Sequence, residues 1–244
     1  MKKLILLIIS NLLIANVESD AALTIDSDVT VTINGMFTNL GNVVNEGTLN
    51  VEYYCNNDSE DCSDDQIVGT ISGSGEFSFS YDLDLESGAN LKSFYAIPED
   101  ASVSNVMSSL GDDITGVITE GGACSQIAPD TWVGSQCTLM PEKGYWVITS
   151  SAAELTLYNA ILTNPAIEYN LNSGANLISF PNFGTVGVEE ALPDNIESSV
   201  TGVITEGGAC SQIFPGGWVG SQCSFMSGKG YWVITTDAIS FSFD

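Results

Sequence analysis

Apolar and polar residues alternate over short distances along most of the chain, which is the pattern of half-buried β-strands. Residues 23–51 alternate with a period of two, and Asn34-Gly35, Leu40-Gly41 and Glu46-Gly47 interrupt the run. Turn dipeptides at such short intervals predict strands that fold back as a hairpin or meander, or that coil as a short β-helix. Both alternatives fit the alternation equally well.

Further strands are predicted from aromatic and β-branched runs that follow turn residues. Residues 90–95, 116–119 and 145–148 are such runs, and residues 176–180 and 231–234 repeat two of them. A helical stripe of apolar residues separates the strands in each half. The stripe comprises Val103, Val106, Met107 and Leu110 after the candidate N-cap Ser102, and Val188, Ala191 and Leu192 before Pro193, which is expected to end the second helix.

One module is written twice in the chain, at a constant offset of 86 residues. TGVITEGGACSQI at 115–127 returns letter for letter at 201–213, and WVGSQC, KGYWVIT and SGANL return at the same offset. Two copies of this length indicate two compact domains in tandem rather than a long solenoid. We predict a signal peptide at 1–19, an N-terminal β segment with a disulfide loop at 20–80, and repeat modules at 81–158 and 167–244.

The predicted fold class is therefore mainly β. The N-terminal β segment, a hairpin, a meander or a short β-helix-like coil, precedes two small antiparallel β domains. Each of these domains is expected to carry one short helix and one disulfide.

Two stretches resemble known groups of proteins. The rhythm NGxxTNxGxVxNxGTLNV resembles passenger segments of bacterial β-helical adhesins and fibre proteins. The order NLxSF, TGVIxEG, WVGS and GYWV, over 81–149 and 169–235, resembles a tandem module of uncharacterised secreted or surface proteins of marine bacteria and of phage-associated proteins. The second resemblance implies secretion and an appendage or structural role without catalytic residues. This chain departs from it by placing a cysteine pair around WVGS.

The first residues predict export. Met1-Lys2-Lys3 is basic, residues 4–15 are almost wholly apolar, and Val17-Glu18-Ser19 offers a cleavage triplet, which is the order of a signal peptide. An N-terminal membrane anchor is the alternative, although the apolar run is shorter than the roughly 20 residues of a comfortable span. We expect a secreted, extracellular or cell-surface protein that begins near Asp20 and has no membrane span after cleavage.

Six cysteines agree with export, because disulfides persist in oxidising compartments. They form three close pairs, Cys55 with Cys62, Cys124 with Cys137, and Cys210 with Cys223. The last two pairs have identical spacing in identical contexts, so one local disulfide is predicted in each module and one in the N-terminal segment. A zinc site is the alternative, but the spacing is not CxxC and the chain has no histidine.

Net charge narrows the possible partners. The formal charge is −26, with 31 acidic and 5 basic residues. Such a surface repels nucleic acid and anionic membranes, and it favours solubility in salty water with divalent cations as counter-ions.

Candidate binding residues have structural alternatives. Trp132 and Trp218, in the cysteine loops, could stack on sugars, or they could fill a small core. Trp146 and Trp232 are expected in the core. Glu120 and Glu206, in the repeated TEGG turn, could form a paired-carboxylate site only across modules, and each is more simply an acceptor for backbone N–H groups in the tight Gly-Gly turn.

The segment around Cys55 and Cys62 is rich in carboxylates, which are oxygen ligands that Ca²⁺ prefers. The residues are Asp58, Glu60, Asp61, Asp64 and Asp65. Their spacing does not match an EF-hand, and a solvated acidic loop is the alternative. No cofactor other than this Ca²⁺ is expected.

The chain has no histidine base, no GxSxG, no P-loop and no dinucleotide fingerprint, and its cysteines are assigned to disulfides, so enzyme activity is not expected. The predicted function is that of a secreted structural or adhesive protein. It would be a subunit of an extracellular filament or surface appendage that associates with itself or with other surface proteins by strand addition through residues 22–33 or 238–243. The alternatives are a pair of carbohydrate-binding modules that hold glycans with Trp132 and Trp218, or a phage fibre component.

Overall fold

The computed structural model describes residues 13–14, 17–19, 23–39, 42–55, 70–72 and 75–243. The protein is mainly β, with many small sheets and a few short helices. It divides into two compact units: residues up to Tyr81 together with Leu157–Leu162, and residues Asp82–Thr156 together with those from Thr163 onward. Among the described helices, none has both the length and the hydropathy needed to cross a membrane.

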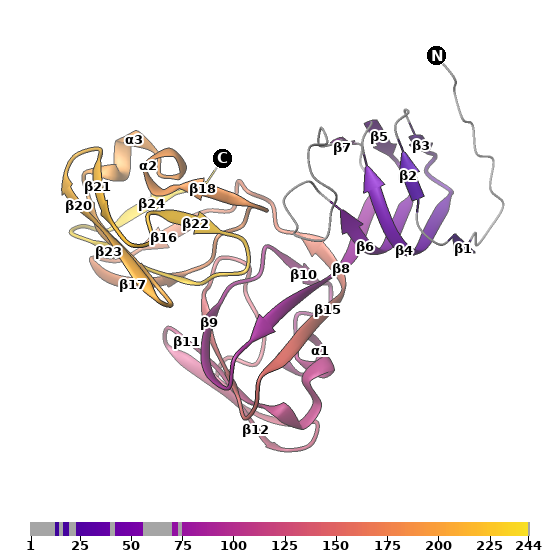
Figure 1. The fold of residues 1–244 in the computed structure, drawn as a ribbon, viewed down its shortest axis with the longest axis horizontal. Helices are drawn as coiled ribbons and strands as arrows, with labels where there is room; N and C mark the ends of the chain where they lie inside the picture. Colours follow the sequence, from indigo (N-terminus) through magenta and orange to yellow (C-terminus); the bar gives the residue numbers. More distant parts are fainter. Residues whose placement is uncertain are drawn as a thin grey trace. The chain divides into compact units, whose positions relative to one another are not determined.

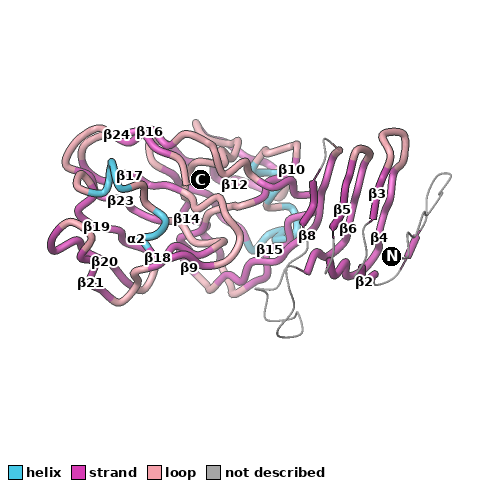
Figure 2. Tube along the Cα trace, turned by 90° about the horizontal axis from the view of Figure 1, so that it is seen from above, coloured by secondary structure: helices cyan, strands magenta, loops and turns pink. Residues whose placement is uncertain are grey.

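The first unit is a coil of parallel strands in two sheets (Figure 2). In one sheet, β1 (Leu13–Ile14) and β2 (Val17–Ser19) both pair with β4 (Thr30–Asn39), which is followed in order by β6 (Thr48–Cys55), β8 (Glu76–Leu85) and β15 (Ala153–Leu162). The other sheet contains β3 (Leu23–Ile25), β5 (Asn42–Asn45) and β7 (Thr70–Ser72). The pairings from β1 to β8 and those from β3 to β7 are parallel. A hairpin or meander would pair its strands antiparallel, so the short β-helix-like coil is the correct alternative.

Alternation places apolar side chains inside this coil in columns. Val31 is in register with Leu49, which is in register with Phe77, and Ile33 is in register with Val51. Val31, Ile33, Leu49 and Val51 are buried. The buried apolar side chains of each strand therefore stack on the buried apolar side chains at the equivalent positions of the strand before it.

The turns of the coil stack as closely as its strands. Asn45 is buried, its side-chain oxygen accepts from the N–H of Gly47 at 3.2 Å, and its backbone oxygen accepts from Gly75 N–H at 2.8 Å. A Cβ on Gly47 would collide with the backbone oxygens of Val29 and Asp26. The glycine of the predicted Glu46-Gly47 turn is thus required for close approach of consecutive turns.

The second unit contains both modules, each built on a five-stranded antiparallel sheet (Figure 1). The first sheet has the order β13 (Thr131–Gly134), β12 (Gly122–Ala128), β11 (Ile114–Thr119), β14 (Tyr145–Thr149) and β9 (Gly88–Lys92), and the second has the equivalent order β21 (Gly217–Gly220), β20 (Gly208–Phe214), β19 (Val200–Thr205), β23 (Tyr231–Thr235) and β17 (Gly174–Ile178). Register shifts fall at equivalent places, between Ile114 and Gly116 and between Val200 and Gly202. The repeat in sequence is thus a repeat in structure.

Short strands and aromatic rings close the second module. The strands are β16 (Tyr169–Leu171), which pairs with β24 (Ile239–Phe241), and β18 (Thr185–Gly187), which pairs with β22 (Ser224–Met226). The first module has one short strand of this kind, β10 (Ala96–Pro98). Phe243 contacts Tyr169, Phe180 and Phe225 edge to face, with ring centroids 5.1 to 5.3 Å apart. The C-terminal run is therefore part of the core of its own module.

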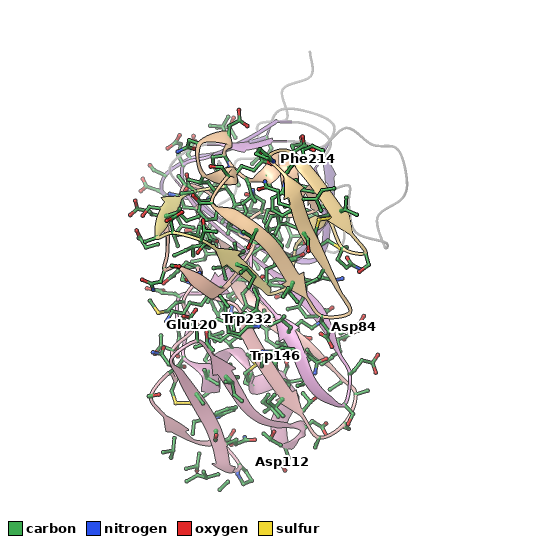
Figure 3. The ribbon with its side chains drawn as sticks, turned by 90° about the vertical axis from the view of Figure 1, so that its left-hand side faces the viewer. Asp84, Asp112, Glu120, Trp146, Phe214 and Trp232 are labelled. Carbon is green, nitrogen blue, oxygen red and sulfur yellow. A yellow bond between two sulfur atoms is a disulfide. The ribbon has the colours of Figure 1, made fainter. Side chains whose placement is uncertain are left out.

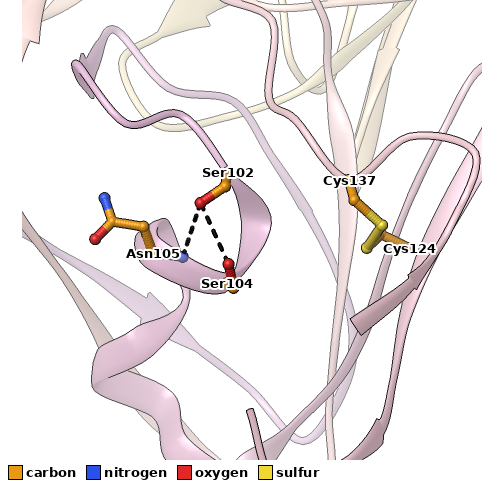
Figure 4. Close-up of a disulfide and its surroundings, with 5 residues drawn as sticks. All are labelled: Ser102, Ser104, Asn105, Cys124 and Cys137. Atoms are coloured by element: carbon orange, nitrogen blue, oxygen red, sulfur yellow. Dashed lines mark hydrogen bonds between the residues drawn. A yellow bond between two sulfur atoms is a disulfide. The ribbon is translucent and has the colours of Figure 1, made fainter. Parts of the chain in front are cut away.

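The predicted helices are present but short. The first stripe forms α1 (Val103–Val106), followed by the 3₁₀ segment η1 (Ser108–Asp113). Ser102 is the N-cap: its hydroxyl accepts from Asn105 N–H at 3.3 Å (Figure 4). The second stripe forms α2 (Val188–Ala191), which ends before Pro193, and a further helix, α3 (Asp194–Glu197), follows that proline.

Both module disulfides are confirmed. Cys124 bonds to Cys137 (Figure 4), which ties β12 to the segment after β13. Cys210 bonds to Cys223 with the same separation of 13 residues, which ties β20 to the segment after β21. Cys137 and Cys223 also accept backbone hydrogen bonds from Val103 and Val188, the first helical residues. Each disulfide thus joins the sheet to the helix of its module.

The turn stack generates a prediction. Gly47→Ala places a methyl group against backbone oxygens that cannot move independently, and we expect it to lower stability of the first unit by about 1–3 kcal/mol. Hydrogen exchange by mass spectrometry should show faster exchange in peptides from 23–55 and unchanged exchange in the modules. Gly187→Ala is the control, because Gly187 has open space around its Cβ position. Unchanged exchange in 23–55 would contradict the close-packed turns.

Candidate functional site

The two modules are joined by reciprocal backbone hydrogen bonds at their edge strands. In one direction, Leu91 oxygen accepts from Gly230 N–H at 3.2 Å, and Ser93 N–H donates to Gly228 oxygen at 3.1 Å. In the other, Leu177 oxygen accepts from Gly144 N–H at 3.3 Å, and Ser179 N–H donates to Glu142 oxygen at 3.2 Å. The two sets of hydrogen bonds join equivalent residues, with the roles of the two modules exchanged. The edges of β9 and β17 are thereby covered.

Glu120 and Glu206 complete this junction. Glu120 Oε2 accepts from Leu177 N–H at 3.0 Å, and Glu206 Oε2 accepts from Leu91 N–H at 3.0 Å. Both glutamates do accept from backbone N–H groups, but the prediction that these groups lie in the Gly-Gly turn is wrong, because each belongs to the other module. We call the two carboxylates and the leucines that they hold the module clamp.

Close contact at the clamp depends on glycine. A Cβ on Gly144 would lie 2.7 Å from Ile178 oxygen and 2.8 Å from a Leu177 methyl group. Gly230 meets Lys92 oxygen and Leu91 in the same way, at 2.7 and 3.0 Å. Glycine is therefore required in the repeated KGYWVIT string because the backbone of the other module lies too close for a side chain.

A cavity of about 370 Å³ lies beside one half of the clamp. Its charged lining residues are Glu120, Glu142, Lys143 and Glu168, and Tyr169 and Ile178 form part of its apolar wall. Tyr169 is committed to the core side, because its hydroxyl shares a 2.7 Å hydrogen bond with the buried Ser179. Within the described ranges, no three carboxylates or other ligating side chains lie close enough together to hold a metal ion.

The residues at the equivalent positions in the other half of the clamp differ. Lys92 replaces Ile178 there, and Leu83 replaces Tyr169. Burial lowers the pKa of Lys92, while the neighbouring Glu206 carboxylate acts to raise it. A Leu83 methyl group reaches within 2.8 Å of the Cβ position of Gly228, which stands where the first module has Glu142.

The loop tryptophans are both half-buried in β13 and β21. Trp218 packs against the core of its module, and its ring nitrogen donates to Glu197 Oε1 of α3 at 2.7 Å. This placement favours the core interpretation for Trp218. Trp132 has Gly111 at the position equivalent to Glu197, so it has no matching carboxylate.

Trp146 and Trp232 are less buried than predicted. Along β14, Tyr145, Val147 and Thr149 are buried, whereas Trp146 and Ile148 are only partly covered. The prediction that the GYWV tryptophans lie in the core is therefore wrong. They lie on the outward side of each sheet, beside the module clamp, and Figure 3 shows Trp146, Trp232 and Glu120 in the middle of the second unit.

Other predicted site residues cannot be placed. The acidic loop of Asp58, Glu60, Asp61, Asp64 and Asp65 lies outside the described residues, as do Cys62 and the side chain of Cys55. The calcium site and the third disulfide therefore stay predictions.

Comparison with known proteins gives no relative for this chain. No protein-family model, no curated protein and no solved structure matches it.

The module clamp can be tested by a double-mutant cycle. Glu120→Ala and Glu206→Ala each remove the exposed carboxylate that accepts a part-buried hydrogen bond from a backbone N–H, so we expect each to lower the free energy of unfolding by about 0.5–1.5 kcal/mol in urea. Because both act on one junction, the two effects should not add. Glu120→Gln and Glu206→Gln keep an oxygen acceptor and should cost less. Alanine variants as stable as the native chain would contradict the clamp.

Buried tyrosines behind the clamp predict alkaline unfolding. Burial raises the pKa of Tyr145 and of Tyr231 to about 12, and their hydroxyls accept from Met140 and Met226 N–H groups. An unfolded tyrosine ionises near pH 10, so this stability is complete below about pH 10 and is lost as pH rises toward 12.

The double variant Tyr145→Phe and Tyr231→Phe should be less stable at pH 8, by about 1 kcal/mol for each lost hydrogen bond. Its urea midpoint should then fall less steeply between about pH 10 and 12 than that of the native chain. An equally steep fall in both proteins would show that these phenols do not control the transition.

Proposed function

We propose that the chain is a secreted, non-catalytic structural protein of an extracellular filament or surface appendage. The observation that carries this proposal is the module clamp, which joins two equivalent sheets into one unit that presents the same outer surface twice. The two module disulfides are compatible with an extracellular protein. Both paired carboxylates act as backbone acceptors, which supports a structural rather than a catalytic role for them.

Assembly by strand addition needs a strand that can be donated or an open sheet edge that can accept one. Both predicted donor runs are paired within the chain: β3 with β5, and β24 with β16. Phe241 and Phe243 are almost completely buried, so donating the C-terminal strand would open its own module. In the coil, β1 and β2 come from the predicted leader, and removal of that leader would uncover the edge of β4 for strand addition.

Glycan binding through the loop tryptophans has weaker support. Trp218 is held by Glu197 and by the module core, which leaves less of its ring for stacking on a sugar. A glycan array on the intact chain, with Trp132→Ala as the comparison, should show no binding that depends on Trp132. Binding that this substitution abolishes would favour the glycan function instead.

Negative-stain microscopy tests the structural function. Protein purified from the culture medium or released from the cell surface, beginning near Asp20, should form assemblies longer than one chain. Protein that is not exported, or that remains a single particle at every salt concentration, would contradict the proposal.

A further inference from the structure

Each module exposes a sheet face without charge, although the chain carries a net charge of −26. The register places Trp146 opposite Ile118, Ile148 opposite Gly116, and Val133 opposite Ser125, all on the sheet side away from the module core. On its other neighbour strand Trp146 is opposite the buried Leu91, so this side is covered at the module junction and open beyond it. Ile127 follows two residues after Ser125 on β12, at a register shift between Gln126 and Ala128, and its side chain is exposed. We call Ile118, Ser125, Ile127, Val133, Trp146 and Ile148 the outer sheet face of the first module.

The second module has the same face, residue for residue. Its members are Ile204, Ser211, Ile213, Val219, Trp232 and Ile234. Three aliphatic members are exposed in each copy: Ile127 by 67% and Ile213 by 64%, Val133 by 57% and Val219 by 58%, and Ile118 by 46% and Ile204 by 44%. Trp146, Ile148 and their counterparts Trp232 and Ile234 are half-buried. Neighbouring positions have diverged, as at Ala128 and Phe214, or Thr131 and Gly217.

Exposed apolar side chains gathered on one sheet face mark an interaction surface. We infer that the outer sheet face packs against the outer sheet face of a second copy of this chain, sheet against sheet. This inference rests on the proposed structural function and names the surface that performs it.

The β-branched side chains of the face and its few hydrogen-bonding groups favour a protein sheet as the partner. β-Branched side chains on a regular strand array interdigitate with a similar array when two sheets stack about 10 Å apart. On this face only the Ser125 hydroxyl and the Trp146 ring nitrogen carry hydrogen-bonding side-chain groups. A glycan, which carries many hydroxyls, would leave most of them unsatisfied there.

Charge and duplication select a second copy. Two chains of charge −26 repel each other, and the uncharged faces are where they can approach with the least repulsion. Because one chain carries the face twice, each copy can contact two neighbours, which gives an open chain of subunits unless the rotation closes. Salt shortens the range of repulsion from about 30 Å at 0.01 M to about 3 Å at 1 M, so assembly should increase with salt.

The test uses the full secreted chain in sedimentation velocity and negative stain at about 0.01 M and 1 M NaCl. The double variant Ile127→Asp and Ile213→Asp places a carboxylate on each face. The matched control is Ala152→Asp with Ala238→Asp, which adds the same charge at equivalent exposed loop positions outside the outer sheet faces. A milder pair, Ile127→Thr and Ile213→Thr, keeps β-branched residues and covers the case in which the aspartates prevent folding.

Native chain and control should assemble at high salt, whereas both face variants should need more than about tenfold more protein to do so. Assembly of the native chain that persists unchanged in folded face variants would overturn the face contact and leave the structural function standing. A native chain that stays monomeric at both salt concentrations would overturn both. Native protein that binds an insoluble glycan but not itself would overturn the second copy as the occupant.

Discussion

The edge strands β9 and β17 each leave a row of backbone N–H and C=O groups without a partner in their own sheet. Exposed edges of this kind invite pairing with other chains, and proteins generally cover them. Here the chain covers each edge with the segment that precedes the GYWV strand of the other module. Glu120 and Glu206 supply the remaining acceptors. The second unit depends on this exchange, because neither module can satisfy its own edge.

The exchange also accounts for features that look unrelated in the sequence. The TEGG turn carries a carboxylate because the other module has an N–H to satisfy, and Gly144 and Gly230 are glycines because the other backbone lies within contact distance. The duplication thus has a structural consequence beyond doubling the length. It closes two vulnerable edges against each other, and it leaves two copies of an uncharged face turned outward.

Local patterns predicted the local structure well. The offset of 86 gave the two module disulfides, the Ser102 cap and the break at Pro193 followed from residue preferences, and the strands followed from alternation. Contacts between distant residues could not be predicted in the same way. A parallel coil and a hairpin share one alternation, so residues 23–51 could not distinguish them. Trp146 was misplaced because both sides of the Tyr145–Thr149 strand are apolar, which reads as a buried strand.

Native-state hydrogen exchange at the Leu91 and Leu177 amides is the sharpest check on the module clamp, because these are the two N–H groups that the clamp carboxylates hold across the junction. Both amides should exchange slowly and with similar protection, close to that of the Val117 and Val203 amides in the central strands. Exchange at the rate of an open edge strand, while the central strands stay protected, would contradict a clamp between the modules.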